Sequence, residues 1–341
     1  MKILVGISGG VDSAFALYKL ARHYSVKAVF FRTGFNSKLE EKVGVICNKL
    51  AVDWQPVDFE DEFRQIVIEK FVQGYAQGIT PNPCIWCNPD FKFKLLLKLA
   101  QKWGFDRIAT GHYARIVKED NTYFLTKAID EKKDQSYFLY RIYPYLNKVV
   151  FPLGEERKQK IKEEMSHLFG NDFFVGESQD LCFVHQGDYR EFFLSRIKPR
   201  SGLIVDIHGQ ILGYHSGIHN FTVGQRQGLG LSKPGPWYVV KIDPDKALVV
   251  VARGQDSNAL SCRCQSLVRM FSNDRIEATA KIRYNQPNVG VKVQVFSTGE
   301  IEVIFAKPQR GVAKGQHLVL YHDDVVIGGG EISRVFYPWG E

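Results

Sequence analysis

The sequence lacks several features that mark membrane-bound, secreted or repetitive proteins. It contains no uninterrupted run of about 18 apolar residues, the length that a helix needs to cross a bilayer. No signal peptide is recognisable, because a strand pattern begins at the first residue. Internal repeats and low-complexity segments are also missing. We therefore expect a cytoplasmic globular protein with no membrane partner.

Cysteine is scarce, with six residues in a chain of 341. In a cytoplasmic protein, so few thiols favour thiol chemistry or metal binding over a framework of structural disulfides. Hydrophobic residues make up 45% and charged residues 24% of the chain, which suits a globular protein of two or three domains. The net charge of +8 favours a polyanionic partner, although a merely basic soluble protein has the same balance.

The first half of the chain alternates strand and helix patterns. Strand patterns cover residues 3–5, 26–31, 54–58 and 107–110. Helix patterns cover residues 14–21, 38–50, 60–76 and 91–102. Pro81 and Pro83 predict a loop over residues 79–84. The alternation predicts a parallel sheet wrapped by helices, with ligands bound at the carboxyl ends of its strands.

From about residue 200 the patterns change to short strands. Alternating or β-branched runs cover residues 237–242, 247–251 and 291–295, and Gly, Asp and Asn separate such runs. This spacing is typical of small β-barrels or sandwiches. We predict an α/β catalytic domain over residues 1–198, a central β-rich domain over 199–270 and a C-terminal β-barrel domain over 271–341.

A glycine-rich segment, GISGGVDS at residues 6–13, follows the first strand pattern. Glycines let a ligand approach the backbone, and the helix that follows adds oriented N–H groups, so the segment predicts a phosphate site. A simple glycine turn capped by Ser8 or Ser13 is the alternative. No Lys-Ser/Thr pair follows the glycines, which excludes a Walker A loop. The string SGGVDS resembles the PP-loop of ATP pyrophosphatases, which implies attack on the α-phosphate of ATP and release of pyrophosphate.

Cys84 and Cys87 stand in the segment TPNPCIWCN. Such a pair can supply half of a zinc site, exchange with disulfides, or provide one nucleophile. A structural zinc would need a second pair, and the only other close pair is Cys262 and Cys264 in the β region. Because the loop is expected at the ligand-binding edge, we favour a nucleophilic thiol. Cys182 alone would be interpreted as a buried core residue, and the polar run ESQD before it favours a loop thiol instead.

Two further strings follow or accompany predicted elements. In ATGHYA, Gly111 would let an adenine or ribose approach the backbone. His112 could contact a phosphate, or it could be a loop histidine satisfied within the chain. In KDQSY, Asp134 has the position of a cap at the start of a solvated helix.

Taken together, the strings SGGVDS, TPNPC, ATGHYA, KDQSYFL, SQDLCF, FTVGQRQGLGL, PWYVV and KIRY resemble those of the tRNA-specific 2-thiouridylases (the MnmA/TrmU family), in the same order. The resemblance runs from residue 1 to about residue 332. PP-loops alone also occur in synthetases for argininosuccinate, GMP and NAD, so the placed cysteines and the β-rich tail make it more specific. It implies a PP-loop domain with a parallel sheet, of the adenine nucleotide α-hydrolase type, followed by β-rich central and C-terminal β-barrel domains.

The resemblance also assigns roles to single residues. Cys87 matches the family's first catalytic thiol, and Cys182 matches the thiol that carries a persulfide. ATP is expected to contact Gly6, Ile7, Ser8, Gly9, Gly10, Val11, Asp12, Ser13, Phe31 and Gly111. The tRNA is expected to contact Asn82, Pro83, Cys84, His112, Lys133, Asp134, Gln135, Arg283, Tyr284 and Gln316. Phe31 would hold the adenine through its backbone, and the only metal expected is the Mg²⁺ that accompanies ATP.

The activity that the resemblance implies is ATP-dependent 2-thiolation of the wobble uridine in tRNAs for Lys, Glu and Gln. Uridine O2 attacks the α-phosphate of ATP, magnesium screens the phosphates, and pyrophosphate leaves. The Cys182 persulfide delivers sulfur to C2, Cys87 attacks the sulfur bridge or hydrosulfide is released, and a Cys87–Cys182 disulfide remains. Thiolates of low pKa are expected, favoured by nearby positive charge. A cysteine desulfurase or a sulfur-relay protein would supply the sulfur.

The sequence departs from the family pattern at three places. Some relatives carry Asp where this chain has Cys84, so the acid–base role assigned to that Asp is in doubt here. Cys84 could also compete with Cys182 for Cys87. Residues 89–90 are Pro-Asp, where the family usually has a basic residue. The segment 31–41 is short, which predicts a trimmed surface loop.

Functions of two other classes remain open. A PP-loop synthetase that forms an amide or amidine on a small molecule would need neither paired thiols nor a basic surface. A tRNA-binding module without catalysis would need neither SGGVDS nor the thiols. The β domains could also serve oligomerisation, although Arg226, Lys281, Arg283 and Arg310 on their loops favour contacts with an RNA backbone.

Overall fold

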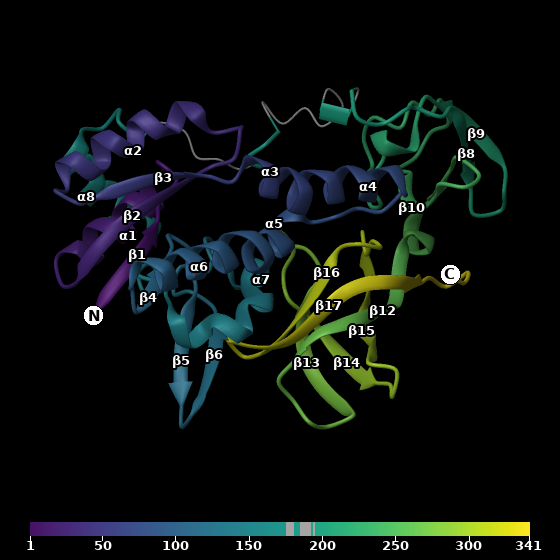
Figure 1. The fold of residues 1–341 in the computed structure, drawn as a ribbon. Coiled ribbons are helices and arrows are strands. Elements are labelled where there is room, and N and C mark those ends of the chain that lie inside the picture. Colours follow the sequence, from purple (N-terminus) through teal and green to yellow (C-terminus); the bar gives the residue numbers. More distant parts are fainter. Residues whose placement is uncertain (175–180, 185–191, 194) are drawn as a thin grey trace. The chain divides into compact units, whose positions relative to one another are not determined.

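Figure 1 shows the protein as a computed structural model in which residues 1–174, 181–184, 192–193 and 195–341 are described. Two units divide the chain. The first contains residues 1–67, 84–187 and 324–326, and the second contains residues 68–83, 188–323 and 327–341. The polar run ESQD at 177–180 lies outside the described residues. No helix among the described residues is long and apolar enough to cross a membrane.

A parallel sheet forms the centre of the first unit. Among the described residues its five strands are β1 Lys2–Gly6, β2 Ser25–Arg32, β3 Trp54–Asp58, β4 Arg107–Ala109 and β7 Val149–Val150. They are arranged in the order β3-β2-β1-β4-β7, and every neighbouring pair is parallel. Ile3, Leu4 and Val5 are fully buried, as expected for a strand covered on both faces. The predicted parallel sheet is confirmed.

Four longer helices accompany this sheet: α1 Val11–Ala21, α2 Ser37–Lys49, α6 Lys94–Trp103 and α8 Lys158–Phe169. Phe15 and Leu17 of α1 share one core with Ile161 and Met165 of α8. α6 ends at Gly104, which takes the left-handed conformation (φ 72°) that stops a helix. The helices predicted near residues 14–21 and 38–50 are present.

The strand order reverses beside β1. The chain leaves β1 toward β2 and β3 on one side, and later returns to β4 and β7 on the other side. In open α/β sheets a ligand binds in the crevice at such a reversal, beyond the carboxyl ends of the strands. Here those ends are the segments that follow β1 and β4.

Three sequence predictions for residues 60–102 need correction. The pattern at 60–76 is helical, but it consists of α3 Glu60–Phe63, the π-helix η1 Arg64–Glu69 and α4 Lys70–Ala76. Pro83 lies in α5 Pro83–Trp86 and not in the preceding loop, because a proline needs no N–H partner in a first helical turn. The helix predicted from 91 is preceded by a second π-helix, η2 Cys87–Phe93, whose wider turn a 3.6-residue pattern does not detect.

A hairpin that the sequence did not predict interrupts the first unit. β5 Arg115–Glu119 and β6 Thr122–Thr126 pair in antiparallel fashion, and Asp120 in their turn has a φ of 50°. Thr126 at the end of β6 also pairs with Val325, far along the chain. α7 Ser136–Leu139 and the 3₁₀-helix η3 Tyr140–Lys148 follow. Short and largely exposed strands carry little hydrophobic pattern, which is why the hairpin escaped prediction.

The second unit contains a small mixed sheet. Its strands are β8 Gly202–Asp206, β9 Ile211–His215, β10 Tyr238–Asp243 and β11 Leu248–Ala252. They lie in the order β10-β11-β8-β9, with β8 and β11 parallel. The short 3₁₀-helices η5 Ile218–Asn220 and η6 Gly254–Ser257 stand outside the sheet. The expected central β-rich region is present.

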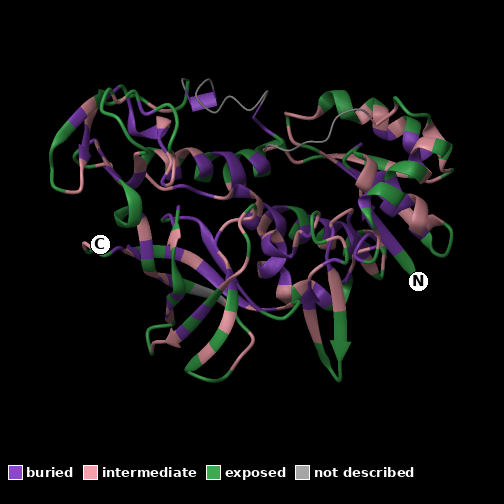
Figure 2. Cartoon of the chain, turned by 180° about the vertical axis from the view of Figure 1, so that it is seen from behind, coloured by how far each residue is buried: buried purple, intermediate pink, exposed green. Residues whose placement is uncertain are grey.

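A closed barrel forms the C-terminal part of the second unit. The strands are β12 Asn258–Arg269, β13 Arg275–Lys281, β14 Val289–Val295, β15 Glu300–Arg310, β16 His317–His322 and β17 Val325–Phe336. They follow the order β12-β15-β14-β13-β16-β17, and β12 also pairs with β17, which closes the barrel. Buried and exposed positions alternate along β14, as Figure 2 shows for the barrel strands. The predicted β-barrel is confirmed.

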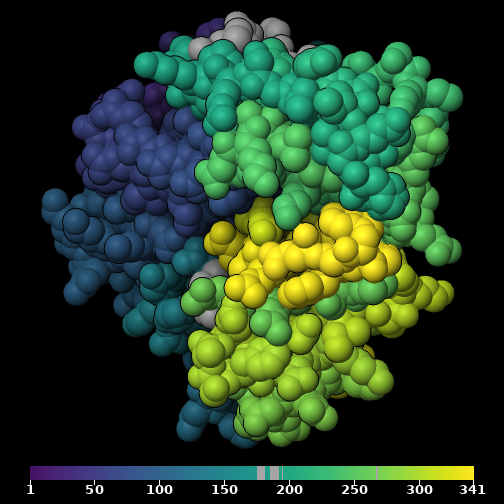
Figure 3. Space-filling view, turned by 90° about the vertical axis from the view of Figure 1, so that its right-hand side faces the viewer, coloured from purple at the N-terminus to yellow at the C-terminus, as the bar shows by residue number. Residues whose placement is uncertain are grey.

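The surface of the barrel is visible in Figure 3, where its strands run from light green to yellow.

β12 precedes the boundary that we predicted at 270/271, and yet it pairs with β15 and β17 of the barrel. The boundaries at 198/199 and 270/271 remain predictions.

Candidate functional site

The segment GISGGVDS forms a turn between β1 and α1. Gly9 takes a φ of 80°, and Gly10 is the residue before α1 and makes no side-chain cap. Ser13 Oγ donates to Gly10 O at 3.0 Å and accepts from Ser8 N at 3.1 Å, which holds the turn closed. First-turn N–H groups of a helix have no partners within it, so this uncapped turn presents donors to an anion. The strand–turn–helix context predicted for the phosphate site is therefore present.

Gly111 lies against this turn. A Cβ atom on Gly111 would stand 2.7 Å from Ser13 N and 2.8 Å from the carbonyl carbon of Asp12. The space that its missing side chain leaves is thus taken by the first turn of α1. We expected the missing side chain of Gly111 to make room for adenine or ribose, and this is wrong. The missing side chain instead lets the loop after β4 pack on α1. A nucleotide contact through other atoms of Gly111 remains a prediction.

Phe31 lies near the carboxyl end of β2. Its carbonyl oxygen accepts a hydrogen bond from Asn36 Nδ2 at 2.8 Å. Its ring packs edge-on against Phe59 and Phe91, with centroids 4.8 and 5.8 Å away. The backbone contact with adenine remains a prediction, and one lone pair of the Phe31 carbonyl is already used by Asn36.

Aromatic packing connects the Cys182 segment with the helix that carries Cys87. Phe183 packs on Phe63 with ring centroids 6.0 Å apart, and Phe63 packs on Phe91 of η2 at 5.2 Å. Cys87 is the first residue of η2 and is buried, whereas Cys182 is exposed. This cluster fixes a segment far along the sequence beside η2.

Three thiols of the first unit lie within electrostatic range of one lysine, Lys92. Cys84, Cys87 and Cys182 each interact electrostatically with Lys92, and Cys182 also interacts with both other thiols. All three are free thiols here, so the disulfide expected after turnover is not formed. The sulfur-transfer roles that the resemblance assigns to Cys87 and Cys182 remain predictions.

The protein around these thiols disfavours their thiolates. Burial raises the pKa of Cys87 to about 12 and that of Cys84 to about 11, although Lys92 opposes the rise. Cys182 is accessible to solvent, but the protein around it still removes part of the hydration of its thiolate, which raises its pKa, again against Lys92. The expectation of low thiolate pKa values is therefore wrong for the protein without its substrates. A positive charge is present, but it is outweighed by lost hydration.

Alkylation should report these raised pKa values directly. With iodoacetamide at pH 8, we expect Cys84 and Cys87 to react at least ~100-fold more slowly than in the urea-denatured chain, because only the thiolate attacks. The rates should climb as the pH rises toward 11, with Cys84 ahead of Cys87. Peptide mass spectrometry would follow each cysteine. Equal rates in the folded and denatured chains at pH 8 would contradict the burial of these thiols.

Lys92, which the sequence analysis did not single out, is the positive charge near the three thiols. It lies in η2, five residues after Cys87, and its side chain keeps access to solvent. Burial lowers the pKa of Lys92, but attraction by the thiolates of the three cysteines outweighs this, so the pKa is raised. The basic residue that seemed absent at 89–90 is thus supplied slightly later in the same helix. Asp90 is paired instead with Arg141, with Nη1 and Oδ2 3.1 Å apart.

His112 stands close to the same group of charges. Its Nδ1 lies 2.8 Å from Thr110 Oγ1, and its ring stacks on Phe93. Burial, and to a lesser degree repulsion by Lys92, holds the pKa of His112 well below its usual value. The imidazole is therefore neutral at neutral pH, and a contact with tRNA at this position would not rely on its charge.

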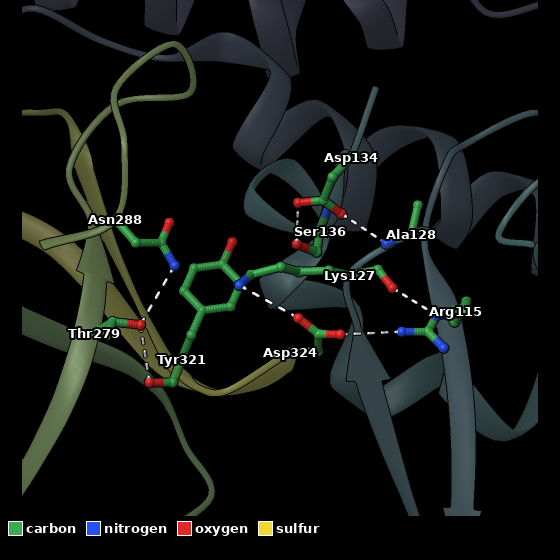
Figure 4. A network of polar contacts seen from close by, with 9 residues as sticks. All are labelled: Arg115, Lys127, Ala128, Asp134, Ser136, Thr279, Asn288, Tyr321 and Asp324. Atoms are coloured by element: carbon green, nitrogen blue, oxygen red, sulfur yellow. Dashed lines mark hydrogen bonds and ion pairs between the residues drawn. The ribbon is translucent and has the colours of Figure 1, made fainter. Parts of the chain in front are cut away.

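Asp134, expected at the tRNA, is buried in the first unit. Figure 4 shows its carboxylate between Ala128 and Ser136. Oδ1 accepts from Ala128 N and Ser136 N, both at 3.1 Å, and Oδ2 accepts from Ser136 Oγ at 2.8 Å. A direct tRNA contact through this carboxylate does not fit, because its bonds to Ala128 and Ser136 hold the loop before α7. The sequence alternative, a solvated helix start capped by Asp134, is wrong in part: the start of α7 is buried and Gln135 is its N-cap residue, although Asp134 does bind the N–H of Ser136.

The neighbours of Asp134 tie the same loop to the rest of the unit. Gln135 Oε1 accepts from Tyr113 N at 2.9 Å, and Gln135 N donates to Tyr113 O at 2.8 Å. Lys133 N donates to Asp130 O at 2.9 Å, and its side chain is half-buried. Figure 4 also shows Asp324 beside Arg115 and Lys127. The tRNA contacts expected of Lys133 and Gln135 remain predictions.

Gln316 in the second unit is also buried. Its Nε2 donates to Thr80 O at 2.9 Å, and Thr80 N donates to Lys314 O at 3.0 Å. These bonds fasten the TPNP segment, in which Asn82 is half-buried and Pro83 buried, to the loop before β16. The Gln316 side chain thus positions this segment, and its burial does not fit the predicted direct contact with tRNA.

The remaining predicted tRNA residues lie after β13. Arg283 Nη2 donates to Val223 O at 2.7 Å, and its side chain is partly buried. The Lys281 ammonium lies 5.2 Å from the centre of the Tyr284 ring. Thr279 Oγ1, shown in Figure 4, donates to Tyr321 O at 3.4 Å within the same barrel. Arg226 and Arg310 are exposed, so both are accessible to a polyanion.

The second close cysteine pair, Cys262 and Cys264, belongs to the core of the barrel. In the described part of the chain, no group of three or more His, Cys, Asp or Glu side chains has an arrangement that could hold a metal ion, and this includes the three thiols near Lys92. Cys262 and Cys264 are fully buried in the barrel, with their sulfur atoms 3.9 Å apart. These residues therefore behave as core side chains of β12.

Known protein families match the chain along most of its length. Residues 1–186 match the model described as tRNA methyl transferase HUP domain, residues 190–253 the tRNA methyl transferase PRC-barrel domain, and residues 256–332 the Aminomethyltransferase beta-barrel domain. The boundary of the matches near 186–190 separates the α/β part from the β-rich chain, and the boundary near 253–256 separates the two β-rich parts.

Curated relatives carry the name tRNA-specific 2-thiouridylase MnmA. The protein of Gloeothece citriformis is 39% identical, over 98% of this chain and 99% of its own length. That of Synechocystis sp. is also 39% identical, over 97% of this chain and 96% of its own. The protein of Syntrophomonas wolfei is 38% identical, over 97% of this chain and 100% of its own. The chain belongs to the family of tRNA-specific 2-thiouridylases.

Proposed function

We propose that this protein is a transferase that uses ATP to replace the O2 of the wobble uridine of tRNA with sulfur. The carrying observation is that aromatic packing places the Cys182 segment beside η2, where Cys87 and Cys182 both interact electrostatically with Lys92, in the same unit as the uncapped phosphate turn. Membership of the 2-thiouridylase family and the net charge of +8 support tRNA as the substrate. Acceptor tRNAs for Lys, Glu and Gln, and a cysteine desulfurase or relay protein as donor, are part of the proposal.

The phosphate turn would serve the first step. Uridine O2 attacks the α-phosphate of ATP, pyrophosphate leaves, and the uridine carries AMP on O2. Backbone N–H groups at the start of α1 would hold the phosphates during this attack. The magnesium that accompanies ATP would offset the phosphate charge. Adenylation converts a poor leaving oxygen into AMP.

The paired thiols would serve the second step. A persulfide on Cys182 attacks C2 through its terminal sulfur, and AMP leaves. The Cys87 thiolate then attacks the inner sulfur of Cys182, which breaks the S–S bond, leaves the thiocarbonyl on the base and forms a Cys87–Cys182 disulfide. A thiol reductant restores both cysteines. Lys92 would stabilise the thiolates, which the free protein disfavours.

A reconstituted reaction tests this proposal. With unmodified tRNA, ATP, magnesium and a persulfide source, we expect 2-thiouridine, AMP and pyrophosphate in equal amounts, and little ATP cleavage without tRNA. Cys87→Ser should lose thiolation at least ~100-fold, because serine cannot release the sulfur bridge. Cys47→Ala, a core thiol of α2, is the matched control. ATP cleavage without tRNA and indifference to Cys87 would favour a small-molecule synthetase instead.

A further inference from the structure

We propose that Lys158 is a positioning residue of the phosphate site, acting by neutralising and orienting Asp12 in the first turn of α1. The proposal rests on the proposed function, because it assumes that this turn binds ATP. Lys158 lies in none of the strings that suggested the function, and no role follows for it from the sequence alone.

The Lys158 side chain, which lies outside the phosphate turn, forms an ion pair with the Asp12 carboxylate. Nζ lies 2.6 Å from Asp12 Oδ1 and 2.7 Å from Oδ2, and the Tyr113 hydroxyl donates to Oδ1 at 2.6 Å. Only 9% of the Lys158 side chain is exposed, against 34% for Asp12, so water screens this pair less than a surface pair. Lys158 N donates to Asp130 Oδ2 at 2.9 Å, which fixes the start of α8.

A second contact holds the other end of α1 to the same stretch of chain. Lys19 Nζ donates to Pro152 O at 3.0 Å and to Glu156 Oε1 at 2.7 Å. The stretch from Pro152 to Lys158 therefore clamps α1 near both of its ends. A helix whose N-terminus binds phosphate gains precision from such a clamp, because the direction of its N–H groups is fixed before the ligand arrives.

The positive charge of Lys158 gives it a second role, besides holding α1 in place. Asp12 is the second residue of α1, where a carboxylate suits the helix dipole but repels an incoming triphosphate. An ammonium on both oxygens removes most of that repulsion while it leaves the helix start intact. Magnesium bound with ATP could offset the same charge in part. The benefit of Lys158 should therefore be greatest where magnesium is scarce.

The test is titration of the full-length protein with ATP at low and at saturating magnesium. Lys158→Met should weaken ATP binding about tenfold or more at low magnesium, and less at saturating magnesium. Lys158→Arg should restore most of the affinity, because its guanidinium can also take both carboxylate oxygens. Lys160→Met is the matched control on the same helix, since Lys160 is exposed and contacts Glu156 and Glu164 instead.

The double variant Asp12→Asn/Lys158→Met separates charge from structure. If Lys158 acts by neutralising Asp12, the double variant should bind ATP more tightly than Lys158→Met alone. Thermal melting identifies any variant that has simply lost its fold. A double variant as weak as Lys158→Met, or a loss that does not depend on magnesium, would overturn the proposal. If the wild type binds ATP and Lys158→Met binds it equally well, this inference alone fails, whereas a wild type without ATP binding would refute the proposed function too.

Discussion

Replacing Cys182 with serine is expected to abolish thiolation by at least ~100-fold while tRNA-dependent release of pyrophosphate continues. A serine oxygen cannot carry the sulfane sulfur, so the second step stops. The phosphate turn is built from residues 6–13 and Gly111, and neither Cys182 nor its neighbour Phe183 contributes to it. The measurement is 2-thiouridine by mass spectrometry of digested tRNA, with pyrophosphate followed in parallel.

The matched control for Cys182→Ser is Cys47→Ala. Cys47 is fully buried in α2, and burial raises its pKa to about 12, so it is a core side chain with no expected part in sulfur transfer. This control should melt at a lower temperature and still thiolate tRNA. A Cys182→Ser protein that transfers sulfur from a persulfide donor as the wild type does would remove Cys182 from the mechanism.

Gly111→Ala is expected to weaken ATP binding by about tenfold to 100-fold and to lower the melting temperature. The added Cβ would stand 2.7 Å from Ser13 N and 2.8 Å from the carbonyl carbon of Asp12. These are backbone atoms, which cannot rotate away as a side chain can. Either the first turn of α1 or the loop after β4 must shift, and the N–H groups aimed at the phosphates shift with it. Nucleotide titration and thermal melting measure the two effects.

Gly290→Ala is the comparison for Gly111→Ala. A Cβ on Gly290 would meet only the Ala306 Cβ at 3.6 Å, an ordinary contact, and Gly290 lies in strand β14 of the other unit. The Gly290→Ala variant should bind ATP as the wild type does. If Gly111→Ala also bound ATP normally, the loop after β4 could not be packed against α1 as closely as the structure has it.

Local pattern was enough to predict the elements that carry the phosphate site. The run Ile3–Val5 is buried on both faces, and such a strand needs an apolar residue at each successive position, which the sequence displays. The helical segments with π-turns were placed less well, at residues 64–69 and 87–93. Their wider turns depart from the 3.6-residue period on which helix prediction rests.

Burial decided the roles of two residues that the resemblance had assigned to tRNA. Asp134 and Gln316 are polar, so their residue types alone suit a contact with RNA. In the structure the Asp134 carboxylate is used by Ser136 and Ala128, and the Gln316 amide is used by Thr80. A buried polar group must find partners within the protein, and these two have found theirs.

The sequence by itself determined which reactive groups the protein has and on which kind of element each one lies. Those properties depend on short stretches, such as the glycine turn after β1 or the thiols of the CxxC pair. Only the tertiary structure decided which groups lie close together: Asp12 pairs with Lys158, 146 residues later, and aromatic packing places the Cys182 segment beside η2, which carries Cys87. It also decided the protonation of the thiols, because the hydration that a thiolate loses depends on all the atoms packed around it.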